Sequence, residues 1–295
     1  MMKNMKTFGS LALASFTLAM GVKVTADEVV QEPAAGPVTE RVLTTEVEWG
    51  PLNPARGDKG PRAGTLWGDR TSSGPSGFLV KFAEGFSSPP HIHNVSYRGV
   101  VISGLVHNDD PNAAQMWLST GSYWTQPAGE AHITSADGSS NLAYIEIEQG
   151  PYLVQPTEEA FDNGEKPVNV DTSNIVWLDA LNSNCAVPSD APACIHGAEI
   201  AFLWGSPQDQ QLNGTLVKLP AGFSGDLRGD AATFRSVVIQ GRAAYRAPGE
   251  TETTPLAPGS YFGSSAASSH RVSCESGADC IFYVRTEGRY DVKPD

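Results

Sequence analysis

The sequence predicts an almost entirely β protein built from two copies of one domain. Short apolar or alternating runs recur between Gly, Pro, Asn, Asp and Ser residues, and they are rich in β-branched and aromatic side chains. This pattern is typical of strands bounded by turns. No long stretch has the 3.6-residue period of an amphipathic helix, and only residues 157–166 predict a short helix or an acidic turn.

An internal repeat relates the two halves of the chain. Arg98-Gly-Val-Val-Ile-Ser-Gly104 returns as Arg235-Ser-Val-Val-Ile-Gln-Gly241, and Gly121-Ser-Tyr-Trp124 returns as Gly259-Ser-Tyr-Phe262. The offset is 137 residues for the first pair and 138 for the second, so one residue is gained in the loop between them. A repeat this long indicates two copies of a domain rather than a solenoid of small units.

The repeat and the composition together predict the domain organisation. A chain of 295 residues is long enough for two domains that each have a core. The stretch before the first copy and the stretch between the copies are acidic and contain Pro. The predicted order is a signal peptide at 1–26, a mobile leader at 27–41, an N-terminal domain at 42–156, a linker at 157–172 and a C-terminal domain at 173–295.

The first residues have the order of a secretory signal peptide. Lys3 and Lys6 precede an apolar run from Phe8 to Met20, and the small residues up to Ala26 offer a cleavage point. The run is shorter than the ~20 residues that a membrane-spanning helix needs. We therefore expect an exported protein, periplasmic or extracellular, with no membrane partner.

The charge balance excludes some partners. The chain has 20 Lys and Arg against 33 Asp and Glu, a net charge of −13 at pH 7. Removing residues 1–26 takes away three Lys and no acid, which leaves 17 against 33. A chain this acidic does not attract nucleic acid or an anionic membrane through bulk electrostatics. We expect a small-molecule partner and no nucleic acid.

All four cysteines lie in the second half of the chain. Export permits disulfides, and the close spacing favours the pairs Cys185–Cys194 and Cys274–Cys280. Four cysteines allow three connectivities, so the pairing is a preference.

Three histidines in the first copy predict a metal site. His91 and His93 occupy alternate positions of one short segment, and a strand points such residues to the same side. His132 follows the turn Pro127-Ala-Gly129, which can bring it alongside from a neighbouring strand. Three imidazoles inside a small barrel can hold a divalent metal ion, with Fe, Mn, Ni and Zn all open, and they leave coordination positions free for chemistry.

The residues around these histidines resemble the paired motifs of the cupin superfamily. The two stretches read Gly85-x5-His91-x-His93-x3-Tyr97-x6-Gly104 and Gly121-x5-Pro127-x-Gly129-x2-His132. With the repeat, the chain is similar to a bacterial two-cupin family of unknown function. The resemblance implies an all-β fold of two tandem cupin barrels (a double-stranded β-helix or jelly roll), which commonly pair through sheet edges as homodimers.

Two positions depart from the family's motifs. The motif glutamate is replaced by Tyr97 or by Arg98, depending on which motif spacing is used, and the final asparagine is replaced by Ala136. Tyr97 keeps the parity of the histidines, so we expect it to point inward as an acid beside the metal or as a weak ligand. Arg98 points the other way and cannot ligate metal, so we expect it to pair with a carboxylate, especially because Arg235 keeps an arginine at the repeat position where the histidines are gone.

The second copy has lost most of the motif. Arg228 and Asp230 replace the first two histidines, Phe234 replaces Tyr97, and only His270 survives. We expect Arg228, Asp230 and His270 to form a salt-linked cluster that fills an inactive barrel. We expect His107 of the first copy in a loop.

Two functions are compatible with this site. Three-histidine cupins without the glutamate resemble dioxygenases that bind a small substrate and O2 at iron, with Tyr97 here moving a proton; an isomerase or hydrolase could use the same site. The alternative is a non-catalytic module that binds a metal or small ligand for sensing or sequestration. The fold does not decide between them, but a competent proton donor and an open coordination position would.

Overall fold

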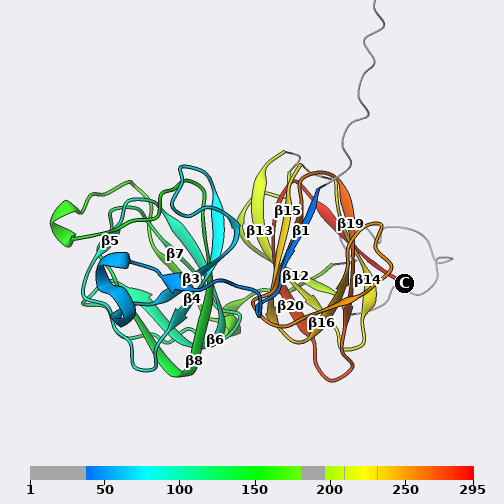
Figure 1. The fold of residues 1–295 in the computed structure, drawn as a ribbon, viewed down its shortest axis with the longest axis horizontal. Helices are drawn as coiled ribbons and strands as arrows, with labels where there is room; N and C mark the ends of the chain where they lie inside the picture. The colour runs from blue at the N-terminus through cyan, green and yellow to red at the C-terminus, as the bar shows by residue number, and fades with distance from the viewer. Residues whose placement is uncertain (1–37, 181–196, 209, 231) are drawn as a thin grey trace, which may run out of the picture. The chain divides into compact units, whose positions relative to one another are not determined.

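The computed structural model describes residues 38–180, 197–208, 210–230 and 232–295 (Figure 1). The predicted signal peptide, most of the predicted leader and the Cys185–Cys194 pair lie outside these residues. The described residues form one compact unit. Strands dominate the regular structure, which confirms the predicted all-β fold. Within the described ranges, no helix is long and apolar enough to span a membrane.

The first half of the chain contributes a seven-stranded antiparallel sheet and a two-stranded ribbon. The sheet has the order β10-β7-β6-β8-β4-β3-β2, and the ribbon pairs β5 with β9. The strands are β2 (Gly50–Pro51), β3 (Arg62–Gly68), β4 (Ser76–Phe82), β5 (Ile92–His93), β6 (Tyr97–Asp109), β7 (Tyr123–Gln126), β8 (Ile133–Ile147), β9 (Val154–Gln155) and β10 (Val168–Val170). Two 3-10 segments, η1 (Pro54–Lys59) and η2 (Thr157–Glu159), lie between strands.

The second half contributes a seven-stranded and a five-stranded sheet. Their orders are β1-β18-β15-β20-β13-β12-β11 and β17-β16-β19-β14-β21. The strands are β1 (Thr39–Val42), β11 (Leu178–Asp179), β12 (Glu199–Gly205), β13 (Leu212–Leu219), β14 (Ser224–Gly229), β15 (Phe234–Gln240), β16 (Ala243–Arg246), β17 (Thr254–Leu256), β18 (Tyr261–Ser264), β19 (Ser268–Cys274), β20 (Cys280–Glu287) and β21 (Tyr290–Pro294). A 3-10 segment, η3 (Thr172–Asn174), precedes β11.

The duplicated strands differ in continuity. β6 and β8 run as long strands through register shifts around Gly104, where φ is +76° and an added Cβ would lie 2.1 Å from Asn141 Oδ1, so only glycine fits. In the second half the same path is divided into β15 and β16 and into β19 and β20. The predicted disulfide Cys274–Cys280 is confirmed, and it joins the end of β19 to the start of β20.

The halves exchange edge strands. β1 pairs with β18 of the second half, with Val42 opposite Tyr261, and β10 pairs with β7 of the first half, with Val170 opposite Tyr123. Thr39–Arg41 of the predicted leader and Val168–Val170 of the predicted linker are therefore strands. Both segments are too short to show a period in the sequence, and the neighbouring sheet edge supplies their hydrogen bonds.

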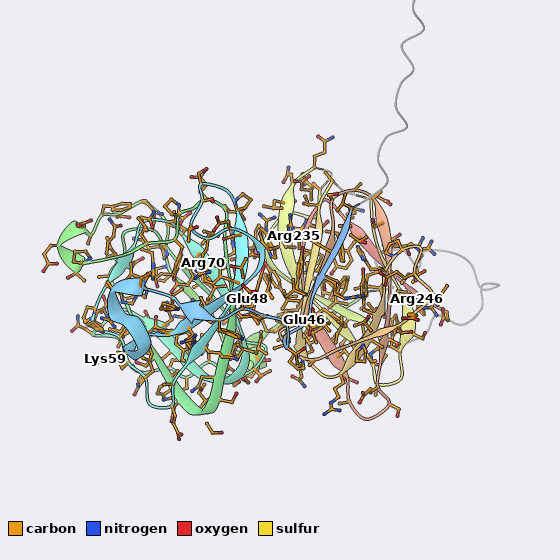
Figure 2. All side chains as sticks on the ribbon, in the orientation of Figure 1. Glu46, Glu48, Lys59, Arg70, Arg235 and Arg246 are labelled. Carbon is orange, nitrogen blue, oxygen red and sulfur yellow. A yellow bond between two sulfur atoms is a disulfide. The ribbon has the colours of Figure 1, made fainter. Side chains whose placement is uncertain are left out.

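A shared apolar core joins the halves. One cluster of buried side chains contains Leu79 and Tyr144 from the first half and Leu216 and Tyr283 from the second. Two further clusters each lie within one half. The repeat also places two arginines reciprocally on the other half: Arg98 lies over the ring of Trp204 at 3.8 Å, and Arg235, labelled in Figure 2, over that of Trp67 at 4.3 Å.

Candidate metal centre

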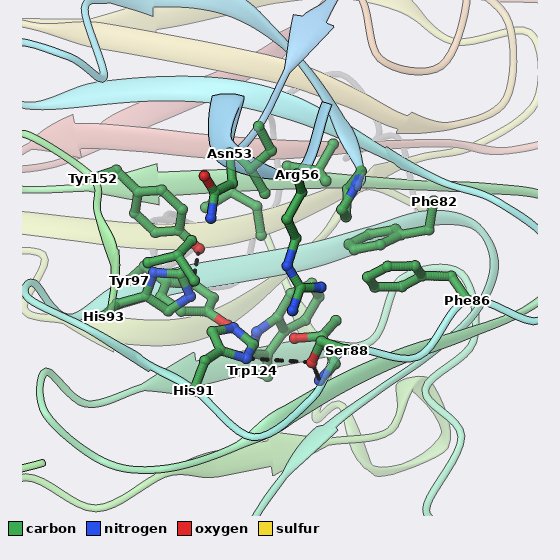
Figure 3. A pocket seen from close by; sticks show the side chains of 16 residues that line it. Asn53, Arg56, Phe82, Phe86, Ser88, His91, His93, Tyr97, Trp124 and Tyr152 are labelled. Carbon is green, nitrogen blue, oxygen red and sulfur yellow. Dashed lines mark hydrogen bonds between the residues drawn. The ribbon is translucent and has the colours of Figure 1, made fainter. Parts of the chain in front are cut away.

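Three backbone segments bring the predicted histidines together. His91 and His132 face each other across an antiparallel bridge, in which the N–H of each donates to the carbonyl of the other at 3.0 Å. His93 lies on β5, opposite Val154 of β9. The three rings form one cluster, and His91 and His93 line a cavity (Figure 3), so the segments that the sequence separates by about 40 residues become neighbours.

The Pro-Ala-Gly turn fixes the position of His132. The N–H of Gly129 donates to the carbonyl of His93 at 2.8 Å, so the turn is anchored directly to the other histidine segment. Gly129 has a φ of +77°, and an added Cβ would lie 2.4 Å from the carbonyl oxygen of Phe161. Only glycine meets both requirements.

Main-chain carbonyls determine which nitrogen each imidazole offers. The Nδ1 atoms of His91, His93 and His132 lie 2.9, 2.9 and 3.1 Å from the carbonyl oxygens of Pro89, Leu153 and Glu130. Because a carbonyl oxygen only accepts, each Nδ1 carries the proton. The three Nε2 atoms therefore keep a lone pair, and such a bond on the opposite nitrogen is how proteins orient metal-binding histidines.

The electrostatics keep these ligands neutral. His93 is 2% exposed and His132 is fully buried, while His91 is partly exposed. Burial lowers the pKa of all three, for His132 to about 3 and for His93 well below the usual value. Neutral imidazole is the form that binds metal.

The donor set fits a divalent ion. Its potential ligand atoms lie within 4.8 Å of one another, and this is a group that could hold a metal ion. His91, His93 and His132 would hold such an ion through their imidazole nitrogens.

Tyr97 is buried beside the histidines, as its parity predicts. Its hydroxyl donates to Asn108 Oδ1 at 2.9 Å and lies 3.4 Å from His132 Nε2. The amide of Asn108 is held in turn by Gln126 at 2.9 Å. Burial raises the pKa of Tyr97, so the phenol stays protonated. Its single O–H group is already engaged in the hydrogen bond to Asn108.

Tyr152 is a site residue that the sequence motifs do not reveal. Its ring stacks on His93 with centroids 4.3 Å apart, and its hydroxyl lies 3.1 Å from His93 Nε2. Because His93 Nδ1 holds the proton, the hydroxyl of Tyr152 is the donor. Burial raises its pKa well above the usual value. Its segment reaches the site through the two-residue pairing of β5 with β9, which leaves no periodic signal in the sequence.

The cavity beside the histidines has a volume of about 60 Å³, room for a few water molecules or one small ligand. Its walls are mostly apolar, and Figure 3 shows Phe82 and Phe86 on the side away from His91 and His93. Arg56 of η1 reaches down between these two sides (Figure 3). Arg56 lies outside both sequence motifs, so neither motif points to it.

Two other predicted positions lie apart from the histidines. Arg98 pairs with Glu148 at 2.8 Å and packs over Trp204, so it acts between the halves rather than at the metal site. The prediction that His107 lies in a loop is wrong. It lies on β6, is 1% exposed, and its Nδ1 is 3.1 Å from the carbonyl oxygen of Met116. The extension of β6 beyond Gly104 explains the difference.

The second barrel has no comparable group among the described residues. Arg228 pairs with Asp226 at 3.1 Å, and Asp230 is exposed, so the expected cluster with His270 does not form. His270 is fully buried, with Nδ1 3.0 Å from the Tyr245 hydroxyl and Nε2 3.1 Å from that of Ser264. Phe234 stacks on its ring at 4.8 Å.

Comparison with known proteins identifies the family. The model of the family described as Domain of unknown function (DUF4437) matches residues 40–293. The chain belongs to this family. A search of curated protein sequences gave no match to this DUF4437 chain.

Solved structures show the fold. A Nostoc punctiforme protein provisionally described as a dioxygenase aligns with a TM-score of 0.60 and 15% identity, over 85% of this chain and 82% of that one. Escherichia coli YlbA gives 0.54 and 13%, over 85% and 91%. A mutant of Bacillus subtilis oxalate decarboxylase gives 0.51 and 13%, over 86% and 78%. These are cupin-fold proteins, so the predicted cupin fold is confirmed for the DUF4437 chain.

Proposed function

We propose that this protein is an exported, metal-dependent enzyme that oxidises a small molecule in a dioxygenase-like reaction in its N-terminal barrel. The observation that carries the proposal is the common orientation of His91, His93 and His132, whose Nδ1–H groups are bonded to main-chain carbonyls and whose Nε2 atoms are left for a ligand. A cavity adjoins them, which a purely structural metal site does not need.

The three histidines would hold the ion. When bound, the ion supplies a Lewis-acid centre and, as Fe(II), a redox centre for O2. Three protein ligands leave positions open for a substrate, which favours an enzyme over a storage or sensing module.

The two phenols have different roles in this proposal. The hydroxyl of Tyr97 donates its hydrogen bond to Asn108, so Tyr97 positions the wall of the site. Tyr152 donates to His93 Nε2, the atom that a metal would take. Its hydroxyl is then free to donate to a substrate oxygen, so Tyr152 replaces Tyr97 as our preferred donor.

Export is supported by the disulfide Cys274–Cys280, which is typical of an oxidising compartment, and by the order of residues 1–26. N-terminal sequencing of protein recovered outside the cytoplasm should begin at or near Asp27. An intact Met1 in that fraction would contradict the proposed cleavage.

The metal assignment is tested by elemental analysis of the purified parent, His132→Gln and His270→Gln. The last is the matched control, because it changes the buried histidine at the repeat position. We expect about one divalent ion in the parent and the control and a loss of at least tenfold in His132→Gln. Equal metal content in all three proteins, with circular dichroism showing each folded, would contradict the ligand assignment.

The enzyme assignment is tested on the Fe(II)-loaded protein with nitric oxide, which mimics O2. An electron paramagnetic resonance signal of an iron–nitrosyl adduct in the parent would demonstrate an open position. An iron-loaded protein that forms no adduct would favour the binding module instead.

A further inference from the structure

Arg56 places an isolated positive charge in the cavity. It extends from η1 toward His91 and Ser88, between the histidines and the pair Phe82 and Phe86 (Figure 3). Among the side chains that the structure describes, neither a hydrogen bond nor an ion pair is found for its guanidinium. A guanidinium carries five N–H donors, so this side chain has its full capacity available.

Three other arginines of the chain are paired with carboxylates, whereas Arg70 bonds to the Thr65 hydroxyl. Arg98 and Arg285 both bind Glu148, and Arg235 binds Glu40. The chain has 33 acidic residues against 20 basic ones, so carboxylates are in excess. Arg56 faces a cavity that no described carboxylate lines, so its guanidinium is available to an anion from outside the chain.

The rest of the cavity offers further donors and an apolar surface. Asn53 accepts from the N–H of Ala55 at 3.0 Å through Oδ1, which leaves its amide N–H groups available. The Nε1–H of Trp124 is buried and has no hydrogen-bond partner among the described residues. No second Lys or Arg and no carboxylate line the cavity within the described residues. A ligand with one negative charge and an apolar body matches this lining better than a phosphate dianion.

We propose that Arg56, assisted by Asn53, binds the carboxylate of a small apolar monocarboxylate, which is the substrate class of this site. The apolar end of the acid lies against Phe82 and Phe86, and its head lies on the side of the histidines. This inference rests on the proposed function for calling the ligand a substrate, but the binding itself does not require catalysis.

The test compares matched acids and amides by calorimetry on the metal-containing protein as purified. The probes are butyrate and butyramide, benzoate and benzamide, and inorganic phosphate. The variants are Arg56→Gln, Arg56→Lys and, as a control that removes the same charge at an exposed position, Arg289→Gln. Metal content and circular dichroism are recorded for each.

We expect the parent and Arg289→Gln to bind at least one acid about tenfold or more tighter than its amide, as for a charge-assisted hydrogen bond. Arg56→Gln should lose this preference, and Arg56→Lys should keep part of it, with metal content unchanged. Equal binding of acid and amide by the parent, no binding of either acid, or a preference that survives in Arg56→Gln would overturn the proposal. Phosphate binding as tight as that of the acids would overturn the carboxylate class.

Failure of the two proposals is distinguishable. A parent that contains no metal but still prefers acids through Arg56 would contradict the proposed function alone. A parent that contains metal and forms the nitrosyl adduct, but shows no acid preference, would contradict this inference alone.

Discussion

The two barrels hold one histidine each at the same repeat position, but only one of these histidines belongs to a candidate metal site. The side chains that contact the two histidines differ. Around His132 the first barrel has Tyr97, Asn108 and Gln126, where the second has Phe234, Tyr245 and Ser264 around His270. In the second barrel, hydroxyls occupy both ring nitrogens of His270 and an aromatic ring covers its face.

The comparison shows that a surviving ligand does not by itself make a site. In the first barrel a main-chain carbonyl holds Nδ1 of His132, and Nε2 stays on the side of the other histidines. In the second barrel the same ring has become part of the core, in contact with Phe262 at 5.3 Å. Whether histidines can bind a metal ion depends on the hydrogen-bond partner of each ring nitrogen as well as on the number of histidines.

Substitution of Phe262 should have the largest effect on the free energy of unfolding. Phe262 stands at the repeat position of Trp124, is fully buried and stacks on Tyr245 at 4.4 Å. Phe262→Ala should lower the free energy of unfolding by about 3–5 kcal/mol, because it removes a large buried ring and leaves a cavity. Urea denaturation measures the loss, and metal content should stay at the parent value because the first barrel keeps its ligands. A loss of metal without a loss of stability would show that the second barrel supports the site directly.

The next largest effect is the pH dependence of stability that His270 contributes. Burial lowers its pKa to about 4, whereas an unfolded histidine titrates near 6.5. Between these values the folded state binds fewer protons, so the stability that His270 contributes is present above pH 6.5 and lost as pH falls toward 4. The shift corresponds to about 3 kcal/mol.

The test is the pH dependence of urea unfolding in metal-free parent and His270→Gln protein. The variant should lose about 3 kcal/mol less than the parent between pH 7 and 4, and glutamine can still bond to both hydroxyls. The histidines of the first barrel contribute equally to both proteins. Identical slopes would mean that His270 is already solvated in the folded state.

The sequence predicted the fold and the three histidines because these depend on spacing. Strand alternation places His91 and His93 on one side, and the repeat fixes the number of barrels. The same reasoning could not find Tyr152 or Arg56, since each reaches the cavity from a segment without a periodic pattern.

The wrong prediction for the second barrel has a physical origin. The salt-linked cluster of Arg228, Asp230 and His270 assumed that replaced ligands stay near their old positions. Arg228 instead pairs with Asp226 on the same strand, where solvent is available. Charged groups avoid an unpaired position in a core, so aromatic side chains filled the barrel in their place.

The reciprocal arginines give the smallest effect and compare the two halves at their contact. Arg98 over Trp204 and Arg235 over Trp67 are related by the repeat, with separations of 3.8 and 4.3 Å. Double-mutant cycles with Arg→Gln and Trp→Leu changes should give coupling energies of about 0.5–2 kcal/mol, as measured by urea denaturation. The shorter contact should give the larger value.

The ion pairs of the two arginines provide the control for this last comparison. Arg98 also binds Glu148, and Arg235 also binds Glu40, so Arg→Lys variants keep the charge but lose the planar group that stacks on indole. If stacking carries the coupling, Arg98→Lys should lose most of it while its coupling to Glu148 persists. If the coupling between residue 98 and Trp204 is unchanged in Arg98→Lys, it depends on charge alone. Stacking of the planar guanidinium would then not explain why both repeat positions hold arginine.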